Sequence, residues 1–356
     1  MVTRGDRLWA LWPMPRDPAV RQGDDGWSIA TSSQPVVPAQ GGAIQRSLPI
    51  APTVPALAIT RVIVVARARH PLDAFATASQ GQGNEKAGGG LMIDSLDLGL
   101  KGKVAIVAGG GAAGDGIGNG RAASILLAEA GAKVMVVDRD EVLAARTVEM
   151  IAERGGEAKA MGADLLSSNE CKGVVDATMA AWGRLDVLDN NIGIGSRLSV
   201  VDETEEHWDR VMEVNVKPMF LMSKHAIPAM IDSGDGGSIV NISSISATRP
   251  KGLTVYSTSK GAVLSLSQAM AVDHGADGIR VNCILPGPVY TPMVYSPGMT
   301  PEHRAQRQNA SLVQIEGEGW DIGKAVVYLS SNWARYVTGH LLVVDGGCSL
   351  SAKPRG

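Results

Sequence analysis

The chain has 356 residues, with 33 Lys and Arg against 36 Asp and Glu and a formal net charge of −3. This balance excludes the basic surface that a nucleic-acid partner requires, and no apolar run is long enough to span a bilayer. The three cysteines, Cys171, Cys283 and Cys348, are odd in number and lack metal-ligand spacing, which predicts structural thiols in a reduced, cytoplasmic protein.

Residues 1–91 differ in composition from the rest of the chain. They hold half of the 18 prolines and a single lysine, Lys86, and no periodic apolar pattern persists. We expect a disordered or weakly ordered extension before one domain over 92–356. Met92 is a natural start for that domain, so the upstream residues are interpreted as an over-extended gene start; a targeting extension is the alternative. Peptides from 1–91 in a mass spectrum of the native protein would refute the first interpretation.

A dinucleotide-binding fingerprint follows this extension. Residues 104–108 form a short apolar run typical of a buried parallel strand, and a glycine-rich loop occupies 109–120. Apolar spacing over 121–130 predicts a helix that ends at Gly131, and 134–137 predicts the next strand. Glycines here let backbone N–H groups reach a pyrophosphate at the helix N-terminus. The candidate phosphate-binding residues are Gly109, Gly114, Gly118 and Gly120.

The second strand stops at Asp138, eighteen residues after Gly120. A carboxylate at this position accepts hydrogen bonds from the adenosine ribose hydroxyls and repels a 2′-phosphate, so the sequence favours NAD over NADP. Arg139 is adjacent and suited to pairing with a phosphate, so NADP remains the alternative cofactor.

Seven strand-like runs alternate with longer helical patterns along the chain. This alternation predicts one α/β domain with a doubly wound parallel sheet of the Rossmann type, and places the cofactor across the carboxyl ends of the strands. The runs are 104–108, 134–138, 159–163, 185–189, 238–242, 280–285 and 340–344.

Tyr256 and Lys260 stand four residues apart, a spacing that places both on one face of a helix. An ammonium beside a phenol favours the phenolate, so we expect Lys260 to lower the pKa of Tyr256. A lowering of ~3 units, which a bound positive nicotinamide ring would assist, corresponds to ~4 kcal/mol. A group that gives and takes a proton near neutrality is what the interconversion of an alcohol and a carbonyl needs.

From about Leu98 to Gly347 the chain resembles the short-chain dehydrogenases/reductases in their single-domain form. The resemblance implies a Rossmann-type fold, a nicotinamide cofactor and a small-molecule alcohol or ketone as substrate. The matching motifs, in the family's order, are the glycine loop, Asp164-Leu165, Asn190-Asn191-Ile192-Gly193, Asn215, Asn241-Ile242-Ser243-Ser244, Tyr256 with Lys260, Ile279-Arg280-Val281-Asn282, Pro286-Gly287 with Thr291, and Val344-Asp345-Gly346-Gly347.

The resemblance implies four catalytic residues. Ser244, rather than Ser243, is expected to orient the substrate oxygen, and Tyr256 to transfer the proton. Lys260 is expected to hold the nicotinamide ribose as well as to act on Tyr256. Asn215, polar within a long helical stretch, is expected to hold a water that links Lys260 to solvent; an exposed helix residue is the alternative.

The resemblance also implies cofactor contacts. Asp164 and the Leu165 backbone are expected beside the adenine, although Asp at a strand end is also a common turn residue. Further contacts are expected from residues that follow later strands, the last two of them at the nicotinamide carboxamide: Asn191, Gly193, Pro286, Gly287, Val289 and Thr291.

Three departures from the family pattern bear on the cofactor groove. Ala108 stands where the family has Thr, which removes one side-chain hydrogen bond. The glycine loop is longer than usual, and the extra residues lie between the strand and Gly118. Ile192 stands where the family has Ala and is expected to narrow the groove. None of these changes removes a reacting group.

Residues 292–313 are expected to close over the substrate. They include Met293, Val294 and Met299, an apolar and adaptable set that suggests a medium-sized, largely apolar secondary alcohol or ketone. The resemblance suggests a homotetramer or dimer built through the long helices that begin near Glu203 and Tyr256.

The leading interpretation is an NAD-dependent alcohol dehydrogenase or ketone reductase. An NADPH-dependent 3-oxoacyl thioester reductase is the main alternative, against which Asp138 argues. A non-catalytic NAD-binding regulator is expected to have lost the Ser, Tyr or Lys, and a sugar-nucleotide epimerase or dehydratase to carry a larger C-terminal region. The six histidines show neither metal-ligand nor triad spacing, so no metal is expected.

Overall fold

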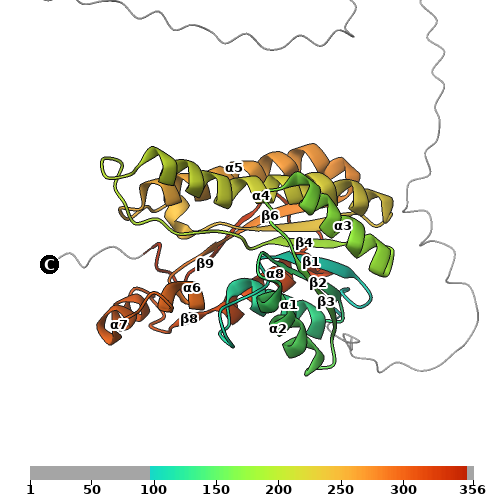
Figure 1. The fold of residues 1–356 in the computed structure, drawn as a ribbon, viewed down its shortest axis with the longest axis horizontal. Coiled ribbons are helices and arrows are strands. Elements are labelled where there is room, and N and C mark those ends of the chain that lie inside the picture. The colour runs from blue at the N-terminus through green and yellow to red at the C-terminus, as the bar shows by residue number, and fades with distance from the viewer. Residues whose placement is uncertain (1–96, 351–356) are drawn as a thin grey trace, which may run out of the picture. The chain divides into compact units, whose positions relative to one another are not determined.

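The computed structural model describes residues 97–350, in which seven parallel strands form one sheet in the order β3-β2-β1-β4-β5-β6-β9 (Figure 1). The predicted doubly wound, Rossmann-type sheet is therefore confirmed, with each strand within two residues of its expected bounds. The predicted extension over 1–91 and the start at Met92 lie outside the described residues. The strands are β1 (Val104–Ala108), β2 (Lys133–Asp138), β3 (Glu157–Gly162), β4 (Val187–Asn190), β5 (Gly237–Ile242), β6 (Ile279–Pro286) and β9 (Leu341–Val344).

Helices cover both faces of the sheet, and each face forms its own apolar layer (Figure 1). Successive residues of a strand point to opposite faces. Along β1, Ile106 and Ala108 join one layer while Ala105 and Val107 join the other. The first layer is covered by α3 (Ser168–Trp182), α4 (Glu205–Asp232) and α5 (Thr254–His274), and the second by α1 (Asn119–Glu129), α2 (Glu141–Ala152) and α8 (Gly319–Ser330).

Side chains cap the N-termini of most of these helices. Asp140 accepts a hydrogen bond from the second residue of α2, and Ser167 and Thr204 cap α3 and α4 in the same way. Gly118 precedes α1, and no side chain caps this helix. The free N–H groups of its first turn are therefore left for another acceptor.

The order of the strands reverses between β1 and β4. The chain adds β2 and β3 on one side of β1, then returns to β4 on the other side and continues outward to β9. In a doubly wound sheet the carboxyl ends of the strands at such a reversal form a crevice that binds ligands. This crevice is where the candidate site lies.

The segment after β6 was expected to be a loop over the substrate, and it forms short elements instead. It contains α6 (Pro292–Tyr295) and α7 (Pro301–Asn309), and β7 (Val289–Tyr290) pairs with β8 (Gly317–Glu318). Between residues 97 and 350, no helix combines the length and the apolar character that crossing a membrane requires.

Candidate active site

A cavity of about 390 Å³ lies at the carboxyl ends of the strands, where the strand order reverses. It is lined from the glycine loop, from the residue that follows β4 and from the start of α6. The lining residues include Gly109, Gly118, Gly120, Asn191, Thr291 and Met293.

The glycines form a cradle that only backbone can occupy. Gly109 has φ +84°, a conformation that L side chains rarely adopt, and a Cβ at Gly120 would run into the Gly109 carbonyl. The cradle opens at the uncapped N-terminus of α1. Bare backbone beside free helix N–H groups fits the pyrophosphate of a dinucleotide.

A buried arginine organises the extra residues of the glycine loop. Arg121, on α1, is fully buried, and its guanidinium donates to the carbonyl oxygens of Ala112, Gly114 and Gly116 at 2.6–2.8 Å and to Thr147 Oγ1 at 2.9 Å. Gly114 thus lies in the inserted segment and is not among the residues that line the cavity, and its contact with a phosphate remains a prediction. The signal in the sequence was a lone Arg in an otherwise apolar helix.

We expect Arg121→Met to loosen the inserted loop. Three carbonyls and a hydroxyl lose their donor, which should lower the free energy of unfolding by about 3 kcal/mol and raise the dissociation constant for a dinucleotide about tenfold. Chemical denaturation and fluorescence titration with NADH measure the two effects. Arg146→Met is the matched control, because Arg146 pairs with Asp115 on the exposed side of the same loop; equal effects of the two variants would contradict the assignment.

Asp138 lies at the end of β2, against the glycine loop. Its Oδ2 accepts from the Gly111 N–H at 3.1 Å and its Oδ1 from the Asp140 N–H at 3.2 Å. The carboxylate is thereby fixed at the edge of the cavity that Gly111 lines. This is the position expected of a group that meets the adenosine ribose.

The predicted adenine contacts are not part of the cavity. Asp164 is exposed, and its Oδ1 accepts from the Leu166 N–H at 3.1 Å, as in the turn that the sequence offered as the alternative. Leu165 is buried in the apolar layer below α3 and α4. Asp164 thus lies in a turn and the Leu165 side chain in the core, and the contact of Asp164 and the Leu165 backbone with the adenine remains a prediction.

Ser243 and Ser244 follow β5, and their hydroxyl groups have different hydrogen-bond partners. The Ser243 hydroxyl is buried and donates to the Lys260 carbonyl at 2.8 Å. Ser244 Oγ instead accepts from the Ser246 N–H at 3.1 Å, and its side chain lowers the pKa of Tyr256. Of the two serines, Ser244 is the one that acts on the Tyr256 phenol.

The pKa of Tyr256 differs from the prediction. Burial raises it above the ordinary value of a phenol, and the hydrogen bond from Ser244 lowers it by less than burial raises it. The expectation that Lys260 lowers the pKa of Tyr256 is wrong for the protein without a bound cofactor. Lys260 Nζ lies 6.0 Å from the centre of the Tyr256 ring and bonds another acceptor. Helix spacing placed the two residues on one face but did not fix where the ammonium points.

That acceptor is the Ile242 carbonyl, to which Lys260 Nζ donates at 2.9 Å. The ammonium is buried, and burial lowers the pKa of Lys260 to about 8. Gly193 makes room for it, because a Cβ at Gly193 would lie 3.1 Å from Nζ and 3.3 Å from Asn215 Oδ1. The structure therefore brings together Gly193, Asn215 and Lys260.

Asn215 is fully buried on α4, so the exposed-residue alternative is wrong. Its Nδ2 donates to the Ile194 carbonyl at 3.0 Å and to Ser259 Oγ at 2.9 Å, and its Oδ1 accepts from the Ile194 N–H at 2.7 Å. Asn215 thus fixes the segment after β4 against the helix that carries Tyr256. A water held by Asn215 remains a prediction.

The residues after β6 divide into two groups. Thr291 is buried and lines the cavity. Pro286, Gly287 and Val289 do not line it; the Gly287 N–H donates to the Val344 carbonyl, and the Val289 carbonyl accepts from Arg307 at 3.0 Å. These three shape the path of the chain toward Thr291.

The inserted glycine loop contacts the segment that follows Thr291. A Cβ at Gly116 would lie 2.5 Å from Pro292 Cγ and still nearer to the Tyr295 hydroxyl. Tyr295 packs on Tyr290 with ring centres 4.8 Å apart. The insertion therefore supports the cover of the cavity, a role that loop length alone did not indicate.

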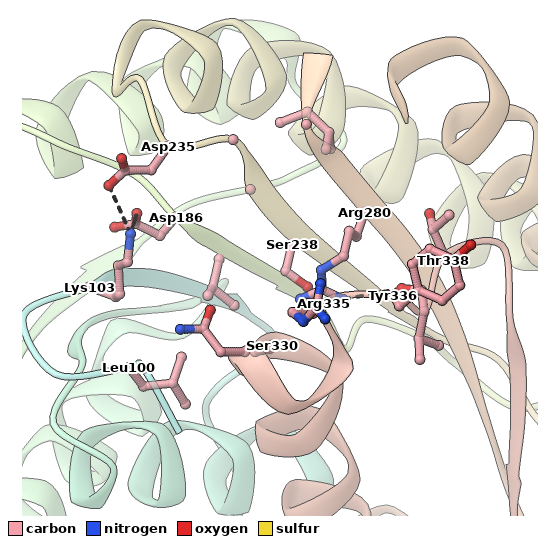
Figure 2. A pocket seen from close by; sticks show the side chains of 18 of the residues that line it. Leu100, Lys103, Asp186, Asp235, Ser238, Arg280, Ser330, Arg335, Tyr336 and Thr338 are labelled. Atoms are coloured by element: carbon pink, nitrogen blue, oxygen red, sulfur yellow. Dashed lines mark hydrogen bonds and ion pairs between the residues drawn. The ribbon is translucent and has the colours of Figure 1, made fainter. Parts of the chain in front are cut away.

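A larger cavity, of about 630 Å³, lies at the opposite, amino ends of the strands (Figure 2). None of the predicted site residues lines it. Lys103 bonds both Asp186 and Asp235 at 3.0 Å, and Arg280 donates to the Val337 carbonyl. Because these charged groups are bound to one another or to backbone, this cavity is not a candidate for the reaction.

Comparisons with known proteins agree with this geometry. Residues 110–349 match the family model described as Enoyl-(Acyl carrier protein) reductase. The chain is 36 % identical over 258 residues to the short chain dehydrogenase/reductase astE of Aspergillus oryzae, which covers 70 % of this chain and 96 % of that protein. It is 37 % identical over 246 residues to the cyclopentanol dehydrogenase of Comamonas testosteroni, with coverages of 69 % and 96 %. A solved short-chain type dehydrogenase/reductase from Mycobacterium marinum superposes with a TM-score of 0.67 at 31 % identity, covering 72 % of this chain and 99 % of that one.

A glycine cradle at the reversal point of a doubly wound sheet, together with a Ser, Tyr and Lys group at the carboxyl end of β5, is typical of an oxidoreductase that works with a nicotinamide dinucleotide. The chain belongs to the short-chain dehydrogenase/reductase family.

Proposed function

We propose that this protein transfers a hydride between NAD(H) and a secondary alcohol or ketone, with Tyr256 as the general acid and base. The observation that carries the proposal is the contact of Ser244 with the Tyr256 phenol at the end of β5, next to buried Lys260. The experiment is a screen of secondary alcohols and ketones with NAD and NADH, followed by absorbance of the reduced cofactor. The proposal would be contradicted if the protein binds NADH but turns over none of the compounds in the screen.

In this reaction the bound nicotinamide supplies or takes up the hydride, and the protein handles the proton. Ser244 holds the substrate oxygen by a hydrogen bond, and Tyr256 donates a proton to that oxygen or removes one from it. Lys260 is proposed to hold the nicotinamide ribose with the N–H bonds that the Ile242 carbonyl does not use. Asn215 keeps the segment after β4 in place around Lys260.

The preference for NAD is supported by Asp138, whose carboxylate is fixed at the cavity edge. We expect Asp138→Ala to raise the dissociation constant for NADH about tenfold and that for NADPH less, because a ribose acceptor and a repelling charge are lost together. Fluorescence titration with both cofactors measures this. Asp138→Asn keeps acceptor oxygen but removes the charge, so it separates the two causes. An unchanged ratio of the two constants in both variants would count against the ribose role.

A largely apolar substrate is supported by the cover of the cavity. Met293 lines the cavity and is exposed over 63 % of its surface, so it is free to adapt to a bound molecule. The cyclopentanol dehydrogenase among the relatives is named for a cyclic secondary alcohol, and we include such alcohols in the screen.

An NADPH-dependent 3-oxoacyl thioester reductase is the second candidate. The family model that matches residues 110–349 is described by an acyl carrier protein substrate, which favours testing a thioester. Asp138 argues against the phosphorylated cofactor. Reduction of a 3-oxoacyl thioester with NADPH, faster than reduction of simple ketones with NADH, would favour this candidate.

We also propose a homo-oligomer formed through the two long helices. Phe220 and Ile231 on α4 and Val272 on α5 are large apolar residues with exposed side chains. Large apolar side chains that are exposed on helices are available to pack against another subunit.

A further inference from the structure

Asp189 is a carboxyl group enclosed within the sheet. It lies on β4, in register with Val107 of β1 and Val240 of β5, and it is fully buried. The two valines belong to the apolar layer that α1 and α8 cover. Residues in register on neighbouring parallel strands face the same side of a sheet, so the Asp189 carboxyl group lies in that layer, where an unpaired polar group is costly.

One side chain bonds this carboxyl group. Asn191 Nδ2 donates to Asp189 Oδ2 at 2.5 Å, whereas Asp189 Oδ1 is buried without a partner. Burial raises the pKa of Asp189 to about 7, against which the Asn191 hydrogen bond acts. A carboxyl group that stays protonated below that pH adds no negative charge beside the groove that fits a pyrophosphate.

We propose that Asp189 is a positioning residue that fixes the side-chain amide of Asn191 in the cofactor groove. The Asn191 backbone is already held, because its N–H donates to the Ala108 carbonyl at 2.8 Å. The Asn191 side chain could still rotate, and its hydrogen bond to Asp189 prevents that rotation. This inference rests on the proposed function.

The consequence is a defined polarity in the groove. With Nδ2 held by Asp189, Oδ1 is the remaining polar atom of the Asn191 side chain, and it accepts no hydrogen bond from residues 97–350. Asn191 lines the cavity beside Gly109. The groove therefore presents the Asn191 Oδ1 acceptor, suited to an O–H or N–H donor of the dinucleotide, in a fixed orientation.

Asp189→Leu tests this role, because it removes the acceptor while keeping the branched shape of the side chain. If Asp189 only supported the fold, its substitution would lower the stability of the protein and its affinity for the cofactor together. A positioning residue in an apolar layer should show opposite effects: a higher melting temperature of the leucine variant, with a dissociation constant for NADH, by fluorescence titration, raised about five- to tenfold. The KM for NADH should rise by a similar factor, with a smaller change in kcat. Asp189→Asn, which keeps an acceptor, should recover most of the affinity.

A double-mutant cycle with Asn191→Ala completes the test. If Asp189 acts through Asn191, Asp189→Leu has no further effect on NADH binding in the Asn191→Ala background. Should the leucine variant fail to fold, Asp189→Asn and Asn191→Ala form the cycle instead: the alanine variant must lose affinity, and the asparagine variant must not add to that loss. Thr178→Val, which removes a buried hydroxyl bonded within α3, is the control and should leave NADH affinity unchanged.

Failure of the proposed function and failure of the inference about Asp189 would give different results. Wild-type protein that does not bind NADH overturns the proposed function itself. Wild-type protein that binds NADH while Asp189→Leu binds it equally well, or additive losses in the cycle, overturns the inference about Asp189 and leaves the proposed function standing.

Discussion

Tyr256→Phe should reduce turnover by about 10³-fold or more, because it removes the hydroxyl that gives and takes the proton while leaving the ring in place. The glycine cradle and Asp138 are untouched, so the dissociation constant for NADH should stay within about twofold of wild type. Initial rates with the best substrate of the screen, and fluorescence titration with NADH, measure the two quantities.

Tyr328→Phe is the matched control for this variant. Tyr328 lies on α8, 39 % exposed, and takes no part in the site. Its variant should keep wild-type turnover. If Tyr256→Phe also keeps more than about a tenth of the activity, another group carries the proton and the assignment of Tyr256 is wrong.

The raised pKa of Tyr256 gives the two directions of the reaction opposite dependences on pH. Burial favours the phenol, which is the form that donates a proton when a ketone is reduced. Oxidation of the alcohol needs the phenolate, whose share increases with pH. We therefore expect the rate of alcohol oxidation to rise from neutral to alkaline pH and the rate of ketone reduction to hold and then fall. Oxidation that is fastest below neutral pH would contradict this.

The fold was predictable because its signals are local. Contiguous apolar runs mark β1 and β2, and glycines at both ends of the loop leave no alternative to a strand, a tight turn and a helix. The family resemblance predicts roles for Ser244, Lys260 and Thr291 that remain predictions; in the structure Ser244 follows β5, Lys260 Nζ bonds the last carbonyl of β5, and Thr291 lines the cavity. A residue that directly follows a strand in the sequence also lies at the end of that strand in space.

The sequence did not reveal properties that depend on contacts between residues distant from one another in the chain. The pKa of Tyr256 depends on how deeply other elements bury it, and the direction of Lys260 depends on the Ile242 carbonyl eighteen residues earlier. The burial of Asp189 arises because β1 and β5 flank it and helices cover it. Periodicity marks a strand but does not reveal that its polar residue has no access to water.

Lys260 illustrates how the site trades stability for function. Its side chain is buried in the neighbourhood of Asn215 and Gly193, and its pKa is lowered from 10.5 to about 8 by burial. Between those two values the unfolded chain binds more protons than the folded one, so unfolding free energy should increase as pH rises from about 8 to 10.5. Below pH 8 the folded protein carries the full cost of the buried charge, about 3 kcal/mol.

Lys260→Met should therefore stabilise the protein while disabling it. At pH 7 the variant is expected to gain up to about 3 kcal/mol in unfolding free energy, less about 1 kcal/mol for the lost bond to the Ile242 carbonyl, and to lose the increase in stability above pH 8. Turnover should fall at least about 10²-fold, because the substitution removes the proposed contact with the nicotinamide ribose. Denaturation at pH 7 and at pH 10, with initial rates, measures these effects.

Lys324→Met, at an exposed lysine of α8, is the control and should change neither quantity. A Lys260→Met variant that is less stable than wild type at pH 7 would mean that the ammonium stabilises the fold, and a variant that keeps its turnover would remove Lys260 from the site. If Lys260→Met is the more stable protein, the buried charge is kept for its chemistry, because selection on stability alone would have replaced it.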